Sequence, residues 1–131
     1  MSFGQRNYDR SRPEIEFPGE TPPEDLVIED LIEGSGPAVQ AGDNVECHYV
    51  GVAWSTGAEF DASWNRGQPL PFTVGVGQVI KGWDDGLLGM KPGGRRRLEI
   101  PPHLAYGDNG AGAEIGPGET LIFVVDLVDV R

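Results

Sequence analysis

Apolar and polar residues alternate with a period of two in several short runs from Asp25 onward, a pattern typical of half-buried β-strands. In residues 44–49, for instance, Val45, Cys47 and Tyr49 share one face. The run at residues 120–130 has apolar side chains on both faces, which favours a position at the centre of a sheet. Further strands are predicted at residues 26–29, around Phe60 after a hairpin turn at residues 55–57, at residues 70–74 and at residues 95–100.

A helical period occurs in one stretch, VIKGWDDGLLGMKPGG, residues 79–94. Ile80, Trp83, Leu87 and Leu88 would form one apolar stripe, and Gly89 can close the helix after about two turns. A helix this short is not stable alone, so other elements must surround it. The sequence therefore predicts an α+β domain in which a five- or six-stranded antiparallel sheet wraps around one short α-helix.

The first 24 residues differ in composition from the rest of the chain. They contain four of the eleven prolines, three basic and five acidic residues, and few apolar side chains. Such a segment buries too little surface to offset the entropy lost on ordering it. We therefore expect a disordered N-terminal tail at residues 1–24 and one folded domain at residues 25–131.

The net charge of −11 limits the classes of partner. An acidic surface repels phosphate backbones and anionic lipid, so we expect neither nucleic acid nor a membrane as a partner. The single cysteine, Cys47, cannot form an intrachain disulfide, and no apolar run has the length of a signal sequence or a membrane span. These features favour a cytoplasmic monomer in a reducing compartment.

Common catalytic motifs are missing from the sequence. The glycines at residues 74–77 lack the third glycine of a dinucleotide fingerprint and the Gly-Lys-Ser/Thr of a P-loop. No serine or cysteine nucleophile stands beside His48 or His103, and Asp84 and Asp85 lie on different faces of the predicted helix. No Cys/His cluster or EF-hand pattern indicates a metal site, and we expect no cofactor.

The remaining polar groups are expected to be structural. His48 and His103 are assigned to the surface, and Cys47 to an inward apolar position. The three arginines at residues 95–97 could form an anion-binding patch, but on a strand they alternate faces, and the acidic domain offers local carboxylates. A solvated run paired with those carboxylates is the favoured interpretation.

Five motifs in register provide a more specific signal: CHYVG at residues 47–51, EFDAS at 59–63, VIKGW at 79–83, AYG at 105–107 and LIFVVDL at 121–127. In this order and spacing the chain resembles the FKBP family of peptidyl-prolyl cis/trans isomerases, which bind macrolide immunosuppressants of the FK506 and rapamycin class. The resemblance covers residues 25–131. It implies a sheet of five or six antiparallel strands around one short helix, as the hydrophobic pattern also predicts.

The resemblance also implies a function: non-covalent isomerisation of X-Pro bonds in peptides and in unfolded or folding proteins, without metal or cofactor. Trp83 would form the floor of the pocket, and Asp61, as a buried carboxylate that needs partners, would pair with Tyr49 and Arg66. An alternative is a binding or chaperone module of the same fold that holds proline-containing segments without efficient catalysis. The implied catalytic residues are Phe60, Asp61, Trp83 and Tyr106, and the implied substrate-binding residues are Tyr49, Arg66, Leu70, Phe72, Val79, Ile80 and Phe123.

Some positions depart from the most familiar pattern of the family. Leu70 stands where an aromatic residue is common, and Ala111 and Glu114 replace residues that are often bulkier or apolar. The pocket rim is therefore expected to be more open and more acidic. Taken singly, an aromatic residue with this spacing is more often part of a core than of a binding site, and Phe72 fits either interpretation.

Overall fold

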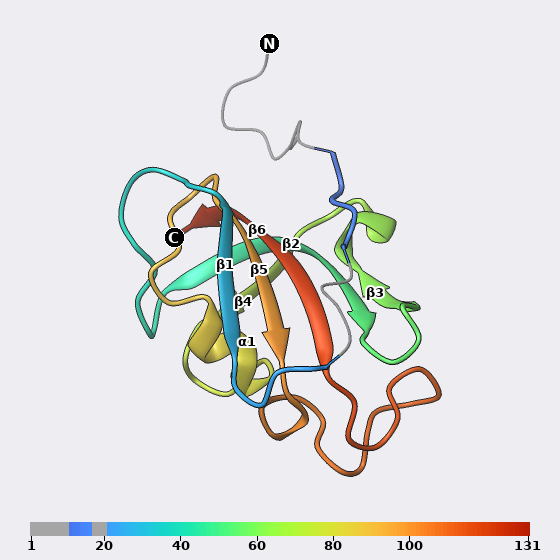
Figure 1. Ribbon diagram of the computed structural model, residues 1–131. Helices are drawn as coiled ribbons and strands as arrows, with labels where there is room; N and C mark the ends of the chain where they lie inside the picture. The colour runs from blue at the N-terminus through green and yellow to red at the C-terminus, as the bar shows by residue number, and fades with distance from the viewer. Residues whose placement is uncertain (1–10, 17–20) are drawn as a thin grey trace.

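The computed structural model describes residues 11–16 and 21–131 (Figure 1). It contains a six-stranded antiparallel sheet and one short α-helix, which confirms the predicted fold class. Over the described residues, no helix is long and apolar enough to cross a membrane. The elements are β1 (Val27–Ile32), β2 (Asn44–Ala53), β3 (Glu59–Ala62), the 3-10 helix η1 (Ser63–Arg66), β4 (Leu70–Thr73), α1 (Lys81–Gly86), β5 (Arg95–Ile100), the 3-10 helix η2 (Pro102–Leu104) and β6 (Leu121–Val130).

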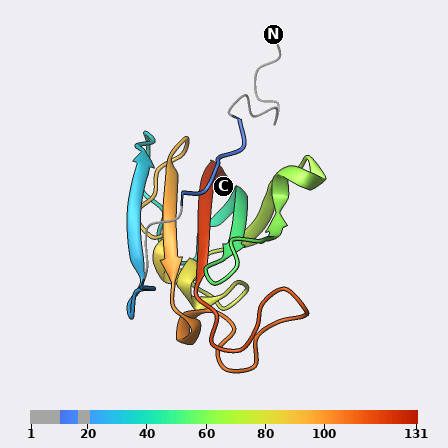
Figure 2. The same ribbon diagram turned by 45° about the vertical axis from the view of Figure 1, so that its right-hand side comes forward.

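The strands follow the order β1-β5-β6-β2-β3, and β4 also pairs with β2. Strand β2 pairs with β6 along one edge and divides its other edge between two short strands. Residues 44–47 of β2 face β4, whereas residues 50–52 face β3, and η1 lies in the chain between these two strands. The result is a twisted, curved sheet (Figure 2).

Strand β6 lies between β5 and β2, as its two apolar faces predict. Its residues 121–127 are buried, and Phe123 pairs with Leu98 on one side and Gly51 on the other. A strand with neighbours on both edges and apolar contacts on both faces forms the most rigid part of such a sheet.

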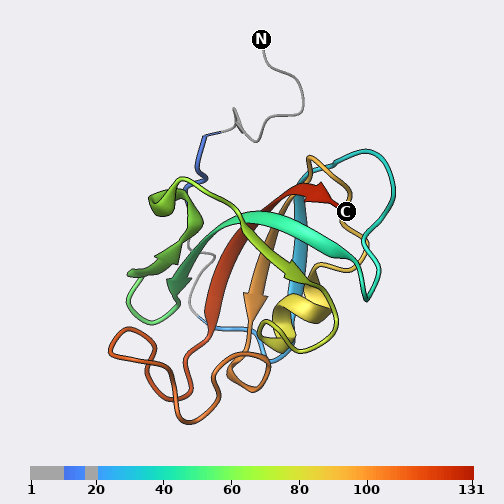
Figure 3. The same ribbon diagram turned by 180° about the vertical axis from the view of Figure 1, so that it is seen from behind.

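Helix α1 lies on the concave face of the sheet (Figure 3) and is only six residues long. Trp83 and Leu87 are buried as predicted, but Leu88 is 42% exposed, so its assignment to the apolar stripe was wrong. The helix ends at Gly86, and Leu88 lies beyond its last turn, where helical spacing no longer applies. Gly89 adopts the expected left-handed conformation, with φ of 85°.

Two glycines allow α1 to approach β5 closely. A Cβ atom on Gly82 would lie 2.5 Å from Cγ2 of Ile100, and one on Gly86 would lie 2.9 Å from Cδ2 of Leu98. Both distances are shorter than van der Waals contact. The helix therefore depends on glycine at the face that meets the sheet, although glycine lowers intrinsic helix stability.

We expect Gly82→Ala to lower the free energy of unfolding by about 1–2 kcal/mol in urea titrations. If there were space for a side chain beside residue 82, the same change would raise the free energy of unfolding by about 1 kcal/mol. The sign of the change in stability therefore tests how closely the helix packs on the sheet. Asp85→Ala, on the exposed side of α1, is the control and should change stability by less than about 0.5 kcal/mol. Stabilisation by Gly82→Ala would contradict the close approach.

The burial of β1 and of His48 differs from the predictions. All six residues of β1 are exposed, because β1 is an edge strand that pairs with β5 alone. His48 is only 5% exposed, so its assignment to the surface was wrong; it stacks on Trp64 with ring centroids 4.2 Å apart. His103 is exposed and Cys47 is fully buried, as expected.

The arginine run is paired, as expected, but Arg96 and Arg97 are buried rather than solvated, and Arg95 is half-buried. Arg95 forms two hydrogen bonds with Asp126, of 2.7 and 2.8 Å. Arg96 bonds Asp30 through Nε at 2.7 Å, and its Nη1 donates to the carbonyl oxygens of Gly86 and Leu88 at the end of α1. A guanidinium that joins the edge strand to free carbonyls at a helix C-terminus stabilises both elements.

Part of the predicted N-terminal tail contacts the domain. Residues 11–16 lie on the face of the sheet opposite α1, and Pro13 is buried there (Figures 1 and 3). The carbonyl oxygen of Ser11 accepts a hydrogen bond of 2.7 Å from Arg95. Residues 1–10 and 17–20 lie outside the described residues, so the expected disorder and the domain boundary at residue 24 stay predictions.

Candidate functional site

A hollow of about 200 Å³ opens beside the N-terminal end of α1. Strands β2, β3, β4 and β6, the loop before α1, and the segment after η2 contribute its walls. Most of the lining is apolar, and Asp61 is the one charged residue in it. The lining residues are Tyr49, Phe60, Asp61, Leu70, Val79, Ile80, Trp83, Tyr106 and Phe123.

A second hollow, on the opposite face, differs in chemistry. Its volume is about 340 Å³, and four glutamates contribute to its lining together with Arg97, Leu31 and Val124. Pockets that bind small molecules or side chains are mostly apolar with a few placed polar groups. The hollow beside α1 is therefore the candidate site.

The indole of Trp83 forms the inner end of the candidate site. It is 4% exposed and lies edge-to-face against Tyr49 and Phe123, with ring centroids 5.0 and 5.2 Å away. Phe60 lies edge-to-face against Phe123 at 5.4 Å. Perpendicular ring pairs of this kind are more favourable than their buried area alone indicates, so they hold the shape of the hollow.

The indole nitrogen Nε1 of Trp83 is buried and has no hydrogen-bond acceptor within the part of the chain that the structure describes. Leaving a buried donor unpaired costs stability, and such groups are uncommon in folded proteins.

Gly51 makes room for two of these rings. A Cβ atom at this position would lie 2.6 Å from Phe123 and 2.7 Å from Phe60, which is too close for either ring to stay in place. Since Gly51 pairs with both Asp61 and Phe123 across β2, its missing side chain lets the walls of the site converge. The motif CHYVG contains this glycine, but sequence reasoning assigned it no role.

Asp61, Tyr49 and Arg66 form a closed hydrogen-bonded group at the edge of the hollow. The Tyr49 hydroxyl donates to Asp61 Oδ2 at 2.6 Å, while Arg66 donates to Asp61 Oδ1 at 2.9 Å and to the Tyr49 hydroxyl oxygen at 2.8 Å. These are the partners that the resemblance implied. The Asp61 side chain is 44% exposed, however, so the expectation of a buried carboxylate was wrong.

The pKa values of these groups favour one protonation state at neutral pH. Partial burial raises the pKa of Asp61, but the hydrogen bonds from Tyr49 and Arg66 outweigh it, and the net pKa lies below its usual range. Burial, together with the Asp61 carboxylate, raises the pKa of both Tyr49 and Tyr106. Asp61 is therefore charged and both tyrosines are protonated donors.

For the X-Pro isomerisation that the resemblance implies, we expect kcat/KM with an uncharged peptide to be level between about pH 7 and 9, because none of these three groups titrates there. The lowered pKa of Asp61 means that its contribution to stability is complete above the usual carboxyl pKa and is lost as the pH falls through the native value. Stopped-flow assays across this range test the plateau. A bell-shaped profile centred near neutrality would instead indicate a proton-transfer step.

A buried serine supports the wall that carries this group. Ser63 Oγ lies 2.8 Å from His48 Nδ1 and accepts a hydrogen bond of 2.7 Å from the backbone N–H of Tyr49. Ser63 begins η1, which ends at Arg66. Neither His48 nor Ser63 was predicted to support the site, because their contact joins β2 to η1 and leaves no local sequence signal.

The predicted site residues divide into three groups. All nine lining residues belong to the predicted set, and Arg66 touches the hollow through Asp61 and Tyr49. Phe72 does not line the hollow; it is buried behind Trp83, with ring centroids 5.5 Å apart. Ala111 packs partly against the core and Glu114 is exposed. Among residues 11–16 and 21–131, no group of three or more histidine, cysteine or acidic side chains could hold a metal ion.

Comparison with known proteins assigns the chain to a family. The sequence model for the FKBP-type peptidyl-prolyl cis-trans isomerase matches residues 36–128. An FK506-binding protein of Streptomyces anulatus is 68% identical over 120 residues, which cover 91% of this chain and 97% of that protein. FK506-binding protein 1A of Neurospora crassa is 56% identical over 107 residues, which cover 81% of this chain and 88% of that protein. The chain therefore belongs to the FKBP-type peptidyl-prolyl cis-trans isomerase family.

A solved structure gives the same result for the fold. The crystal structure of AtFKBP13 matches with a TM-score of 0.75 and 43% sequence identity, over 81% of this chain and 93% of that one. The family and the fold expected from the five motifs are thus confirmed.

Proposed function

We propose that the hollow beside α1 accelerates rotation about X-Pro bonds by binding the twisted form of the amide better than the planar form. Rotation breaks the resonance of the C–N bond, with a barrier of roughly 18–20 kcal/mol, and needs no covalent bond to the protein. A catalyst of this reaction needs only to favour the transition state over the ground state. Acid, base, nucleophile and metal are not required.

Apolar enclosure is the first source of this preference. The planar amide is the more charge-separated form, so a lining of aromatic rings with little water disfavours it more than the twisted form. Trp83 provides the floor for the prolyl ring, and Phe60 and Phe123 close two sides. The single observation that carries the proposal is this ring-lined hollow over the indole of Trp83.

Placed hydrogen-bond donors are the second source. Tyr106, which is 39% exposed, and Ile80, which precedes the first residue of α1, both line the hollow, and the donors proposed here are the Tyr106 hydroxyl and the backbone N–H of Ile80. In the proposed mechanism they hold carbonyl groups of the substrate. Asp61 stays ionised and orients the local field, and no proton is transferred. Each tenfold in rate needs about 1.4 kcal/mol, so several such contacts suffice for a useful catalyst.

Macrolide binding in the same hollow is part of the proposal. Relatives named FK506-binding protein share up to 68% identity with this chain, and an apolar hollow with a few donors suits such a ligand. Proline-containing segments of unfolded or folding proteins are the proposed natural substrates.

A protease-coupled assay on X-Pro tetrapeptides tests the proposal. We expect first-order isomerisation that accelerates in proportion to protein concentration and is inhibited by FK506. Tryptophan fluorescence, recorded in the same titration, reports binding at Trp83. Quenching by FK506 without any acceleration would instead identify a binding module, and the absence of both would exclude this hollow as the functional site.

A further inference from the structure

We propose that Arg12 is a positioning residue for the pocket: it ties the start of β3 to η1 and so holds the wall that carries Phe60, Asp61 and Arg66. The inference rests on the proposed function of that pocket. Arg12 lies outside residues 36–128, the part that matches the family model, and within the segment that composition assigns to a disordered tail.

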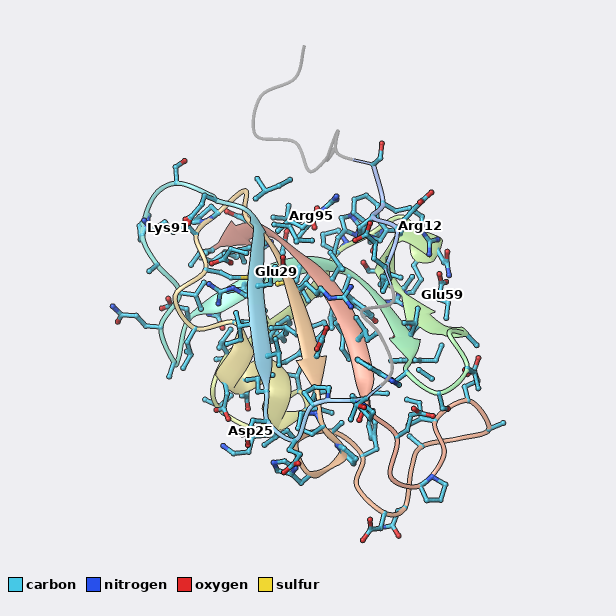
Figure 4. The ribbon with its side chains drawn as sticks, in the orientation of Figure 1. Arg12, Asp25, Glu29, Glu59, Lys91 and Arg95 are labelled. Carbon is cyan, nitrogen blue, oxygen red and sulfur yellow. The ribbon has the colours of Figure 1, made fainter. Side chains whose placement is uncertain are left out.

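Arg12 completes a three-membered polar group on the outer side of the wall. Its Nη1 donates to Asn65 Oδ1 at 2.9 Å, and its Nη2 contacts Glu59 Oε1. Asn65 Nδ2 in turn donates to Glu59 Oε2 at 3.0 Å. Figure 4 shows the Arg12 and Glu59 side chains on the same side of the molecule, near β3. Because a guanidinium offers two donors in a fixed fork, it can set the separation of both partners.

The two partners stand directly beside site residues in the chain. Glu59 precedes Phe60 and Asp61, and Asn65 precedes Arg66. The outer contact between Glu59 and Asn65 therefore spans the same segment as the inner pair of Asp61 and Arg66. A shift of Glu59 relative to Asn65 would change the distance between the two charged groups at the pocket edge.

The wall, formed by β3 and η1, needs such support because few backbone hydrogen bonds hold it to the rest of the sheet. Strand β3 has four residues and pairs with β2 alone, and a β-bulge interrupts that pairing after Gly51. Segments with short ladders and exposed hydrogen bonds open more readily than central strands. On the inner side Ser63 anchors η1 to β2, and on the outer side Arg12 adds two contacts to the hydrogen bond between Asn65 of η1 and Glu59 of β3.

The residues around Arg12 reduce the cost of ordering this segment. Ser11 is held by Arg95, and Pro13 is buried against the sheet. Proline has a fixed φ and restricts the preceding residue to extended conformations, so Arg12 loses less entropy on docking than it would before another residue. Three consecutive residues thus contact the domain.

Variants in the full-length chain test the role of Arg12. We expect Arg12→Ala to lower kcat/KM for an X-Pro tetrapeptide about fivefold and to speed hydrogen exchange of amides 59–66, with little change in the midpoint of urea unfolding. Arg12→Lys, which keeps the charge but loses the fork, should recover only part of the activity. Arg131→Ala is the matched control, because it also removes a surface arginine paired with a glutamate, Glu46. It should change neither kcat/KM nor the hydrogen exchange of amides 59–66.

Each outcome decides the proposal. Unchanged exchange of amides 59–66 in Arg12→Ala would overturn it, as would faster exchange with unchanged kcat/KM. Equal losses of activity in Arg12→Ala and Arg131→Ala would also overturn it, since they would reflect surface charge alone. If the wild-type chain does not accelerate X-Pro rotation at all, the proposed function fails, and the exchange measurement alone then decides whether Arg12 holds the wall.

Discussion

Phe123→Ala is expected to lower the free energy of unfolding by about 3–5 kcal/mol and to abolish most isomerase activity. The ring is 4% exposed, lies on the central strand β6, and contacts the rings of Tyr49, Phe60 and Trp83. Removing it leaves a void in the core and opens the hollow on the side of β6. Urea unfolding and the X-Pro assay on one preparation measure both effects.

Phe60→Ala is the matched control for this prediction. Phe60 contacts the same ring but is only partly buried, so its removal should cost about half as much stability while still lowering activity. The comparison separates core packing from the lining of the hollow. A loss of less than about 1 kcal/mol in Phe123→Ala would show that this ring is not part of the core.

Asp61→Asn is expected to lower kcat/KM about tenfold or more, with a smaller effect on folding. Both partners of the carboxylate, the Tyr49 hydroxyl and the Arg66 guanidinium, donate hydrogen bonds to it. An amide of the same shape has one oxygen and one NH₂ group, so it can accept from only one of them. The loss of one charge-assisted hydrogen bond, about 1.5 kcal/mol, is enough for the expected change in rate.

Asp85→Asn removes the same charge from an exposed position on α1 and controls for long-range electrostatics. Its kcat/KM should match that of the wild type. If Asp61→Asn keeps full activity, or if both variants lose activity equally, the hydrogen bonds of the Asp61 carboxylate with Tyr49 and Arg66 do not contribute to catalysis.

The strands could be predicted where burial imposes a period on the sequence. β2 alternates over residues 44–49 and β6 is apolar on both faces, because both strands lie within the sheet and pack against the core. In β1 burial does not alternate from residue to residue, because β1 is an edge strand and neither of its faces is fully covered. Helix α1 was shorter than its apolar stripe, since Leu88 follows the helix end instead of continuing it.

Buried polar groups could not be predicted from the sequence, because their partners are distant along the chain. Arg96 pairs with Asp30, 66 residues away, and its burial depends on that pairing. His48 is covered by Trp64 and contacts Ser63, and only the path of β3 and η1 brings these residues together. The contacts of Arg12 were missed for the same reason.

The candidate site was predicted through the motifs of a family, not through hydrophobic spacing. Period two places Phe72 and Phe123 equally well in a core, and in the folded chain only Phe123 lines the hollow. The roles of Gly51 and Gly82 were not predicted either. At each position the missing side chain permits a close contact, and a pattern of apolar residues does not reveal such a contact.

Exchange NMR on an X-Pro peptide with catalytic amounts of the protein tests the central claim most directly, because it records binding and rotation together without a coupling protease. The account predicts exchange cross-peaks between the cis and trans forms that grow with protein concentration, at rates equal in H₂O and D₂O, and that disappear when FK506 fills the hollow. Peptide binding with no gain in the exchange rate, or a rate that falls substantially in D₂O, would contradict it.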